Sequence, residues 1–458
     1  MKTIKLISLY IVLCATLLQS SCKKILEIDP PSNSLVPATV FKSNEVATSA
    51  ILGIYSVMAL SGFASGDSGS ISSLCGLTAD EFIGYNPNLL PFYNNQIPAD
   101  NSALTALWLS IYQRIYTANS ILEGLKDADN ISLATKNELQ GEALFIRAFC
   151  YFYLVNLFGD VPLHLSTNLQ INSQTSRMQS AEVYKQIVAD LKSAEDLLSE
   201  NYITVERIRP NKATANALLA RVYLYLQDWT NAEFYSTKVI DRTSLYSLVA
   251  LNDIFLKNSS EAIWQLMPTA NSNTNDGNLL ILTTTPSLVS LNGNLATSVF
   301  EVSDKRKDSW IRSITNATGT FYYPYKYKVK SSATVTEYSM VIRLAELYLI
   351  RAEARANLNK LAISIGDLDK IRSRAGLPLI ADTDPTINQT ELLKAIVKER
   401  RIELFSEWGH RWLDLNRTRN ADLILRPIKS NWQSTDTLFP ISKDEITRNL
   451  NIIQNDGY

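Results

Sequence analysis

Apolar residues recur at steps of three and four along much of this chain, which is the spacing of amphipathic helices. One stripe contains Trp108, Ile111, Ile115 and Leu122. Stretches with the same spacing are residues 44–58, 138–158, 211–240, 343–375 and 396–415. The pattern therefore predicts a mainly α protein.

Two of these stretches predict paired helices. In 211–240, Leu219, Ala220, Tyr223 and Ala232 resemble the tetratricopeptide spacing, in which small residues let antiparallel helices approach closely. Residues 343–375 show a similar pattern of a helical pair. We expect tetratricopeptide-like helical pairs that form a partial solenoid.

Residues from Thr243 to about Tyr338 are the least helical part. They hold short strand-like runs at 262–266 and 321–329, whereas 62–73 and 85–100 predict loops by their Gly, Ser and Pro content. We expect loops, short strands and irregular helices to cover the solenoid. Residues 41–242 and 243–458 are predicted to be two parts that pack as one globular unit.

The N-terminus predicts a targeting segment. Lys2 and Lys5 precede an apolar core at 6–18, and small residues lead to Cys22. We expect 1–21 to be a lipoprotein signal peptide, Cys22 to be acylated, and the proline-bearing stretch 22–40 to be a tether. Cleavage near Ser21 without lipid, or a lone apolar cysteine, is the alternative. No later stretch is expected to span a membrane, so the body is expected to be soluble and tethered.

Charge and cysteine content narrow the classes of partner. Removing residues 1–21 takes away two lysines and no acidic residue, so the formal charge falls from −1 to −3 and gives no sign of nucleic-acid binding. Two histidines and no paired-cysteine pattern argue against a metal site, and we expect no cofactor. A disulfide between Cys75 and Cys150 is one alternative, but the position of Cys150 within an aromatic helix favours a small buried apolar residue.

The highly charged stretch 398–419 offers carboxylates that could serve as an acid/base pair for glycoside hydrolysis. Glu399, Glu403 and Glu407 stand four apart, but interleaved arginines keep carboxylates ionised, whereas a general acid needs a raised pKa. We expect structural ion pairs instead, with Arg400 facing Glu403 and Glu407 facing Arg411. Expected partners on the 343–355 helix are Glu346, Arg351, Glu353 and Arg355.

Recognisable nucleophile, zinc-protease and phosphate-loop motifs are absent from the sequence, so we expect no enzyme. His410, between Trp408 and Trp412, is interpreted as a packed, hydrogen-bonded histidine rather than a catalytic base.

Aromatic residues beside amides or charges in loops are the candidate ligand contacts, because sugars present apolar faces and hydroxyl edges. The candidates are Tyr85, Tyr93, Asn95 and Trp310. The alternating aromatic residues from Phe321 to Tyr327 share one strand face, which we expect to pack on helices, with Lys326 and Lys328 on the other face.

Three segments resemble, in order, the SusD/RagB family of outer-membrane nutrient-binding lipoproteins. They are RLAELYLIRAEARANLN at 343–359, ERRIELFSEWGHRWLDLNR at 399–417 and LFPISKDEITRNLNIIQNDGY at 438–458. Ser406 and Ser442 depart from the family pattern. The structural motif residues are Arg343, Glu346, Glu353, Arg400, Glu403, Arg411 and Asp414.

The resemblance implies a lipid-anchored protein on the exterior of the outer membrane. It implies binding of a nutrient, most often an oligosaccharide, and delivery to a SusC-like TonB-dependent transporter. A peptide-binding relative, or a helical-repeat scaffold that binds protein alone, is the alternative. The resemblance names no ligand.

Overall fold

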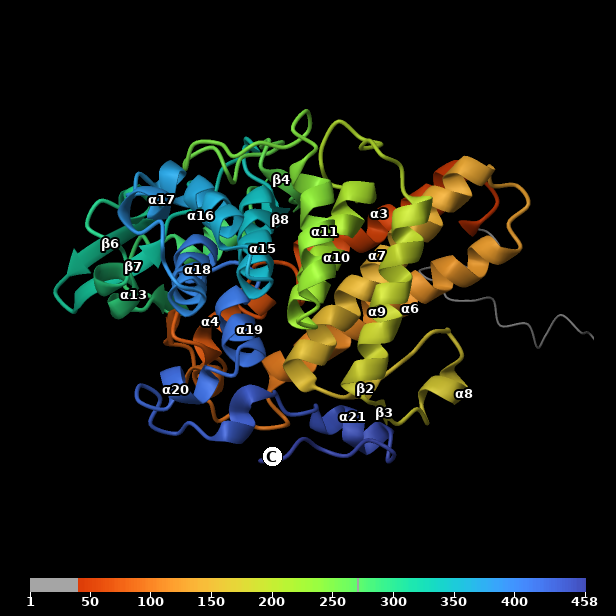
Figure 1. The fold of residues 1–458 in the computed structure, drawn as a ribbon. Coiled ribbons are helices and arrows are strands. Elements are labelled where there is room, and N and C mark those ends of the chain that lie inside the picture. Colours follow the sequence, from red (N-terminus) through yellow and green to blue (C-terminus); the bar gives the residue numbers. More distant parts are fainter. Residues whose placement is uncertain (1–39, 270–271) are drawn as a thin grey trace, which may run out of the picture.

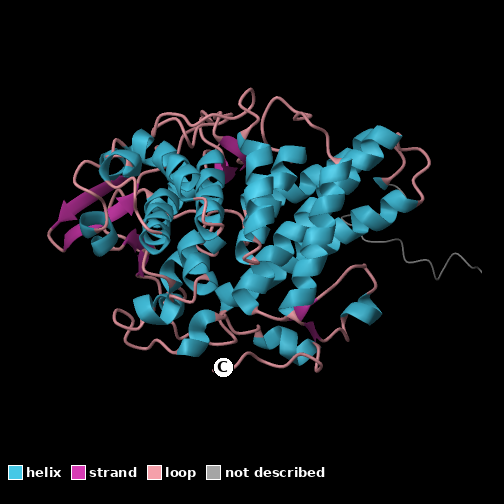
Figure 2. Cartoon of the chain, viewed as in Figure 1, coloured by secondary structure: helices cyan, strands magenta, loops and turns pink. Residues whose placement is uncertain are grey.

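The computed structural model describes residues 40–269 and 272–458, and most of them are helical (Figures 1 and 2). The predicted signal peptide, most of the tether and Cys22 lie outside the described residues. The mainly α fold class is confirmed.

The long helices are α3 (Asn44–Leu60), α6 (Ser102–Lys126), α7 (Leu133–Phe158), α9 (Ser180–Leu197), α10 (Lys212–Tyr225), α11 (Trp229–Ile240), α15 (Leu344–Asn357), α16 (Leu361–Ala375) and α18 (Gln389–Leu404). The short ones are α4 (Ile71–Thr78), α5 (Leu90–Tyr93), α8 (Leu169–Asn172), α12 (Asn275–Leu280), α13 (Gly293–Ser298), α14 (Lys305–Trp310), α17 (Ile380–Thr383), α19 (His410–Arg417), α20 (Ala421–Leu425), α21 (Lys443–Arg448) and the 3-10 helix η2 (Ser434–Thr437).

Helix α7 is the central core helix, and α6 and α9 pack on it. Within 40–269 and 272–458 it alone has the length and apolarity of a membrane span, contrary to the expectation that no such stretch follows the N-terminus. The most apolar 18-residue stretch of this helix is 89% buried inside the protein, so its apolar residues form part of the hydrophobic core. Ser132 caps its first turn and Gly159, at a φ of 72°, ends it.

Helices α10 and α11 form one pair and α15 and α16 another, and α11 packs on α15 (Figure 1). The inner face of α10 is rich in alanine, which lets its neighbours approach closely. The core crosses the boundary predicted at 242/243, since Phe149 on α7 packs edge-on against Trp264 and Trp408 at 5.1 and 5.6 Å between ring centroids. The division into two parts itself stays a prediction.

The strands form one four-stranded antiparallel sheet, in the order β1-β5-β7-β6, and two short pairs, β2-β3 and β4-β8. Their bounds are β1 (Phe82–Gly84), β2 (Val161–Pro162), β3 (Arg177–Met178), β4 (Ala262–Leu266), β5 (Val289–Leu291), β6 (Ile311–Asn316), β7 (Gly319–Pro324) and β8 (Ser339–Arg343). Phe82 pairs with Leu291, so this sheet joins chain segments more than 200 positions apart.

The strand-face prediction for residues 321–327 is wrong for Lys326. This lysine is buried, donates to the backbone carbonyls of Glu403 and Phe405 at 2.8 Å, and forms an ion pair with Glu407 at 2.5 Å. Strand β7 ends at Pro324, so the alternation that placed Lys326 outside stops two residues before it.

Carboxylates of the 398–419 stretch lie inside a buried ion-pair network. Its members are Glu261, Asp304, Arg306, Lys326, Arg343, Arg374, Glu399, Glu403 and Glu407. Glu403 is fully buried and accepts from Arg343 at 2.6 Å, from Arg306 at 2.9 Å and from Arg374. Burial alone would raise the pKa of Glu403, but the three guanidinium groups hold it well below its ordinary value.

Two predicted ion pairs within the 398–419 stretch are wrong. Arg400 binds Asp414 at 2.9 Å rather than Glu403, and Arg411 binds Asp80 at 2.7 Å rather than Glu407. For Glu407 and Arg411 the cause is the end of α18 at Leu404, after which Phe405 is extended and the helical spacing no longer applies. Arg400 and Glu403 both lie in α18, but the Glu403 carboxylate is instead bound by arginines of other segments.

Ion pairs between the 343–355 helix and the 398–419 stretch were predicted for Glu346, Arg351, Glu353 and Arg355, and among these only Glu353 pairs with that stretch. Glu346 is buried and binds Arg221 on α10 at 2.6 Å, and Glu353 binds Arg417 on α19 at 2.6 Å. Arg351 instead binds Asp367 on the neighbouring α16 at 2.7 Å. Arg355 binds the same Asp367 at 2.8 Å and Glu233 on α11 at 3.0 Å.

His410 is buried, as predicted, and burial lowers its pKa to about 4. Its Nδ1 makes no hydrogen bond and its Nε2 lies 4.0 Å from Glu346, so the hydrogen-bonded part of the interpretation is wrong. Cys75 and Cys150 are both buried and unpaired, which excludes a disulfide between them in this structure.

Candidate functional site

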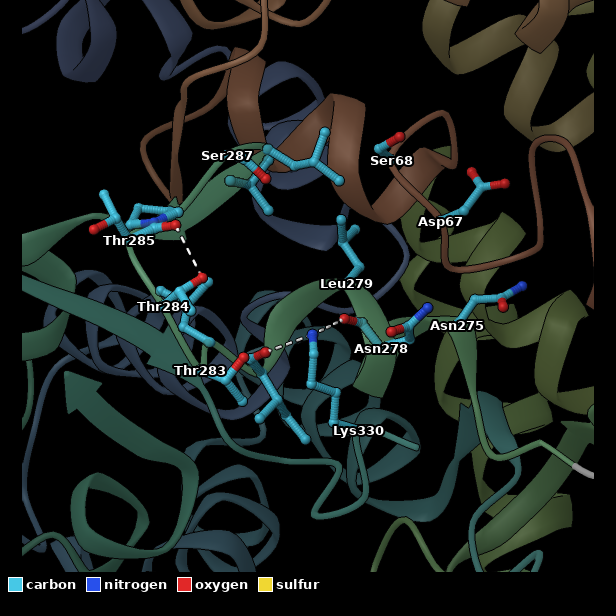
Figure 3. Close-up of a pocket in the computed structure, with 15 residues that line it drawn as sticks. Asp67, Ser68, Asn275, Asn278, Leu279, Thr283, Thr284, Thr285, Ser287 and Lys330 are labelled. Carbon is cyan, nitrogen blue, oxygen red and sulfur yellow. Dashed lines mark hydrogen bonds between the residues drawn. The ribbon is translucent and has the colours of Figure 1, made fainter. Parts of the chain in front are cut away.

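A groove of about 330 Å³ lies between the loop at residues 66–69, helix α12 and the segment 281–288 (Figure 3). Figure 3 places the hydroxyls of Thr283, Thr284 and Thr285 on one side, with Asp67 and Ser68 across the groove. The walls therefore come from segments about 215 positions apart in the chain.

The 66–69 loop is held by its own polar groups. The Asp67 Oδ1 accepts from the Gly69 N–H at 2.8 Å, and the Ser70 hydroxyl donates to the Asp67 carbonyl at 2.6 Å. Gly66 has a φ of +79°, in the region that favours glycine, and a Cβ there would lie 2.2 Å from the Asp276 carboxylate. The loop therefore packs directly against α12.

Helix α12 forms one wall and is fixed at both ends. The Thr274 side chain accepts from the Gly277 N–H at 3.0 Å, and the Asn275 amide donates to the carbonyl of Ala59, at the end of α3. The Lys330 ammonium donates to the carbonyls of Asn278 and Ile281 at 2.6 and 2.9 Å (Figure 3). A cation at this end complements the helix dipole.

The opposite wall presents exposed hydroxyls from Thr283, Thr284, Thr285 and Ser287, with Leu288 half-buried beside them. The backbone carbonyl of Leu288 accepts from the Tyr85 N–H at 2.9 Å, which extends the pairing of β5 with β1. The sheet therefore sets the position of this wall.

The groove is suited to a neutral, hydroxyl-rich ligand. Leu279, Leu282 and Leu288 supply half-buried apolar surface, and threonine, serine and asparagine side chains surround it. Such a mixture matches sugar rings, which have apolar faces and polar edges. Asp67 and Lys330 are the charged groups among the described lining residues, and the Lys330 ammonium already holds two carbonyls.

A second carboxylate lies buried under the 66–69 loop without lining the groove. Asp276 accepts from the Ser339 hydroxyl at 3.0 Å, and its burial raises its pKa to about 7. The negative charges of Glu407 and Asp67 raise this pKa further. Asp276 is thus a supporting group that fixes the close approach of α12 and the loop.

The sequence-predicted ligand residues are not brought together. Tyr85 is half-exposed near the groove: its hydroxyl hydrogen-bonds Ser290 at 2.9 Å, and its ring packs edge-on against Phe321. Tyr93 is half-buried on α5, with the Lys429 ammonium 4.3 Å from its ring centroid. Both stay predictions.

Two of the predicted ligand residues are wrong because their side chains are buried. Trp310 is 0% exposed, and its indole N–H donates to the Leu251 carbonyl at 3.0 Å. Asn95 is 3% exposed and donates to the Thr78 carbonyl at 3.2 Å. Neither can reach a ligand in this structure.

Residues 283–288 of the groove were missed. They hold no aromatic residue, but they form a run rich in hydroxyl residues, TTTPSL, shortly after the polar stretch 272–278. That run outside any apolar periodicity is the signal that could have identified the wall.

Comparison with known families matches most of the chain. Residues 24–224 match a model described as "Starch-binding associating with outer membrane", of the SusD-like type, and residues 300–458 match the SusD family model.

Individual relatives cover nearly the whole chain at low identity. SusD-like protein P25 of Formosa agariphila is 26% identical and covers 87% of both chains, and a SusD-like protein of Bacteroides ovatus is 24% identical over 89% of this chain and 81% of its own.

Solved structures share the fold. A SusD superfamily protein of Bacteroides vulgatus superimposes with a TM-score of 0.80 at 22% identity, over 92% of this chain and all of its own. A laminarin-binding SusD-like protein gives 0.77 at 24%, over 91% and 100%. The two family matches together cover most of the chain, and the second contains all three sequence motifs, so this chain belongs to the SusD/RagB family.

Proposed function

We propose that this protein binds a neutral glycan in the groove between α12, the 66–69 loop and residues 281–288. The observation that carries the proposal is the composition of the groove, where exposed hydroxyl and amide groups surround half-buried leucines. The family's starch-binding description and the laminarin-binding structural relative support the same ligand class.

We infer binding without catalysis. Glycoside hydrolysis ordinarily uses two carboxyl groups that flank the scissile bond. Asp67 is the single carboxylate among the described residues that line the groove. Asp276 lies beneath the 66–69 loop and is 5% exposed.

A triple variant that removes hydroxyls tests the groove. Thr283→Val, Thr284→Val and Ser287→Ala together keep the shape of the wall but remove three exposed hydroxyls. Since a hydrogen bond contributes about 0.5–1.5 kcal/mol, we expect glycan affinity to fall at least about tenfold. Isothermal titration with the tightest-binding member of an oligosaccharide panel, laminarin oligosaccharides included, measures it.

Thr315→Val with Thr320→Val is the matched control. These two exposed threonines hydrogen-bond each other on the neighbouring β6-β7 hairpin, outside the groove. We expect less than about a twofold change, since no bond to the ligand is lost. Unchanged affinity in the folded triple variant would place the site elsewhere. A panel in which peptides bind and oligosaccharides do not would favour the peptide-binding alternative. Hydrolysis of any panel member would show that the protein is an enzyme.

We further propose that the bound glycan passes to a SusC-like TonB-dependent transporter in the outer membrane. Membership of the SusD/RagB family and the description of its matching model as associating with the outer membrane support this. The protein is proposed to face the cell exterior, held by acyl chains on Cys22.

Cys22→Ala tests the anchor. We expect the variant to fold and bind glycan as the parent does, but to leave the membrane fraction, because its thiol is the predicted acylation site. Fractionation at high salt followed by immunoblotting measures the distribution. Cys75→Ala, which alters a buried unpaired cysteine, controls for loss of a thiol. Retention of the Cys22→Ala protein in washed membranes would refute lipid anchoring at this residue.

A further inference from the structure

The outer face of α3 exposes apolar side chains along its whole length. Val46 is 41% exposed, Leu52 and Val57 are 38% exposed and Leu60 is 58% exposed. Small residues lie between them on the same side. We name this surface the α3 face and define it as Val46, Ser49, Leu52, Gly53, Ser56, Val57 and Leu60, all of which are exposed.

The α3 face carries no charge from Val46 onward, and the exposed Glu45 lies on the same side in the first turn of the helix. Between Glu45 and Asp67 the sequence has no acidic or basic residue, although this stretch includes a solvent-exposed helix side. Other exposed helix sides carry charged pairs, such as Lys185 with Glu182 on α9 and Lys394 with Glu391 on α18. Depletion of charge together with exposed apolar groups is typical of the central part of a protein interface.

Gly53 lies at the middle of the α3 face, and the fold of this chain does not require it there. A Cβ at Gly53 would meet nothing within 4 Å. An exposed glycine inside a helix is about 0.5–1 kcal/mol less favourable than alanine. A glycine at this position instead leaves room for close approach by another chain.

A cavity beside α3 could accept a side chain of a binding partner. It measures about 460 Å³ and is lined by Thr48 of α3, by Glu138 and Leu139 of α7 and by Ile203 and Arg209 of the loop between α9 and α10. The exposed side chains of the α3 face project beside this cavity, and interfaces of high shape complementarity use such adjacent projections and hollows.

Helix α3 connects the predicted membrane tether to the candidate groove. It begins four positions after Val40, the first described residue, and Cys22 lies 18 positions before Val40. At its other end, the Asn275 amide of the groove donates to the carbonyls of Ala59 and Leu60 at 3.1 and 3.4 Å. A partner seated on the α3 face would therefore lie near both the tether and the groove.

We propose that the α3 face is the docking surface for the outer-membrane transporter, and that the contacting transporter surface is uncharged and partly apolar. This inference rests on the proposed function, in which a transporter receives the glycan. A bilayer surface fits the face less well, because helices that lie on membranes carry Lys or Arg beside large aromatic groups. The α3 face has neither.

Gly53→Arg tests the docking surface, with Gly366→Arg as the matched control. Gly366 is also an exposed glycine inside a helix, α16, with nothing within 4 Å of a built Cβ. Arginine favours helix over glycine, so both variants should melt at or above the parent temperature. The full-length proteins, tagged and expressed in the native cells, are affinity-purified from detergent-solubilised outer membranes. The co-purified TonB-dependent transporter is identified and quantified by mass spectrometry.

We expect Gly53→Arg to reduce the recovered transporter at least tenfold and Gly366→Arg to leave it within twofold. Val57→Glu, a second change on the α3 face, should act as Gly53→Arg does. Glycan affinity of the isolated proteins should stay at the parent value in all three. These results together would support the α3 face as the docking surface.

Parent-like recovery with Gly53→Arg and Val57→Glu would overturn this surface while leaving the proposed function intact. Failure of the parent itself to recover a transporter would instead overturn the proposed delivery, and the inference with it. A parent dimer in solution that Gly53→Arg converts to monomer would assign the face to self-association. Liposome binding of the Cys22→Ala protein that Gly53→Arg abolishes would assign it to the bilayer.

Discussion

Replacing Glu403 by alanine is expected to destabilise the protein by about 3–5 kcal/mol, the typical effect of removing one partner from a buried charge pair. Glu403 is 0% exposed and accepts hydrogen bonds from Arg343, Arg306 and Arg374. Without this carboxylate, the three guanidinium groups would lose a shared counter-charge in a region that excludes water. Urea unfolding followed by circular dichroism measures the change.

Glu391→Ala provides the comparison on the same helix. Glu391 pairs with Lys394 at 2.8 Å, but the two side chains are 53% and 68% exposed, so its loss should change stability by less than about 1 kcal/mol. Glycan affinity of folded Glu403→Ala should equal that of the parent, since Glu403 does not line the groove. Equal destabilisation by the two substitutions would show that the buried network contributes no more than a surface pair.

The sequence predicted that the carboxylates of 398–419 are structural, but it assigned wrong partners to Arg400 and Arg411. For Glu407 and Arg411, prediction by helical spacing requires the helix to continue, whereas α18 ends at Leu404. Arg400 and Glu403 share the helix, but tertiary contacts with other arginines bind the Glu403 carboxylate, and helical spacing does not report such contacts. Ser406 and Trp408 then take positive φ values of 58° and 46°, which local propensity does not favour for either residue. Tertiary contacts, such as the Trp408 indole N–H donating to the Met340 carbonyl at 2.6 Å, hold the bend.

The helical scaffold could be predicted because its signal is periodic and local. The stripe of Trp108, Ile111 and Ile115 lies on one buried side of α6, as its spacing indicates. The ligand surface depends on contacts between distant segments. The pairing of Phe82 with Leu291 places residues near Tyr85 beside the 281–288 wall, and no local pattern in either segment reports that pairing.

Composition also misled the choice of ligand residues. Charged residues flank Trp310 in a part of the chain without helical periodicity, and this pattern predicts an exposed aromatic residue. In the structure it is the last residue of the short helix α14, and the Lys326 ammonium lies 4.7 Å from its ring centroid inside the core. A large aromatic side chain gains more from burial than from exposure, so charged neighbours in sequence are weak evidence of a surface position.

Gly66→Ala is expected to destabilise the protein by at least about 2 kcal/mol and to weaken glycan binding about tenfold or more. Two effects combine at this position. The φ of +79° costs a residue with a side chain about 1–2 kcal/mol, and the new Cβ would lie 2.2 Å from the Asp276 Oδ2. The 66–69 loop must then move away from α12, and this displaces Asp67 and Ser68, which line the groove.

A double-mutant cycle with Asp276→Ala separates strain from collision. The atoms that the Cβ at position 66 would strike are the Asp276 carboxylate oxygens and Cγ, all of which alanine lacks. In the Asp276→Ala background, Gly66→Ala should therefore lose only the conformational strain of about 1–2 kcal/mol, which makes the two changes non-additive. Thermal unfolding of the four proteins gives the coupling energy, and titration with the glycan reports the groove. Equal losses in the two backgrounds would mean that no collision occurs, and that the loop does not depend on its contact with α12 for its position.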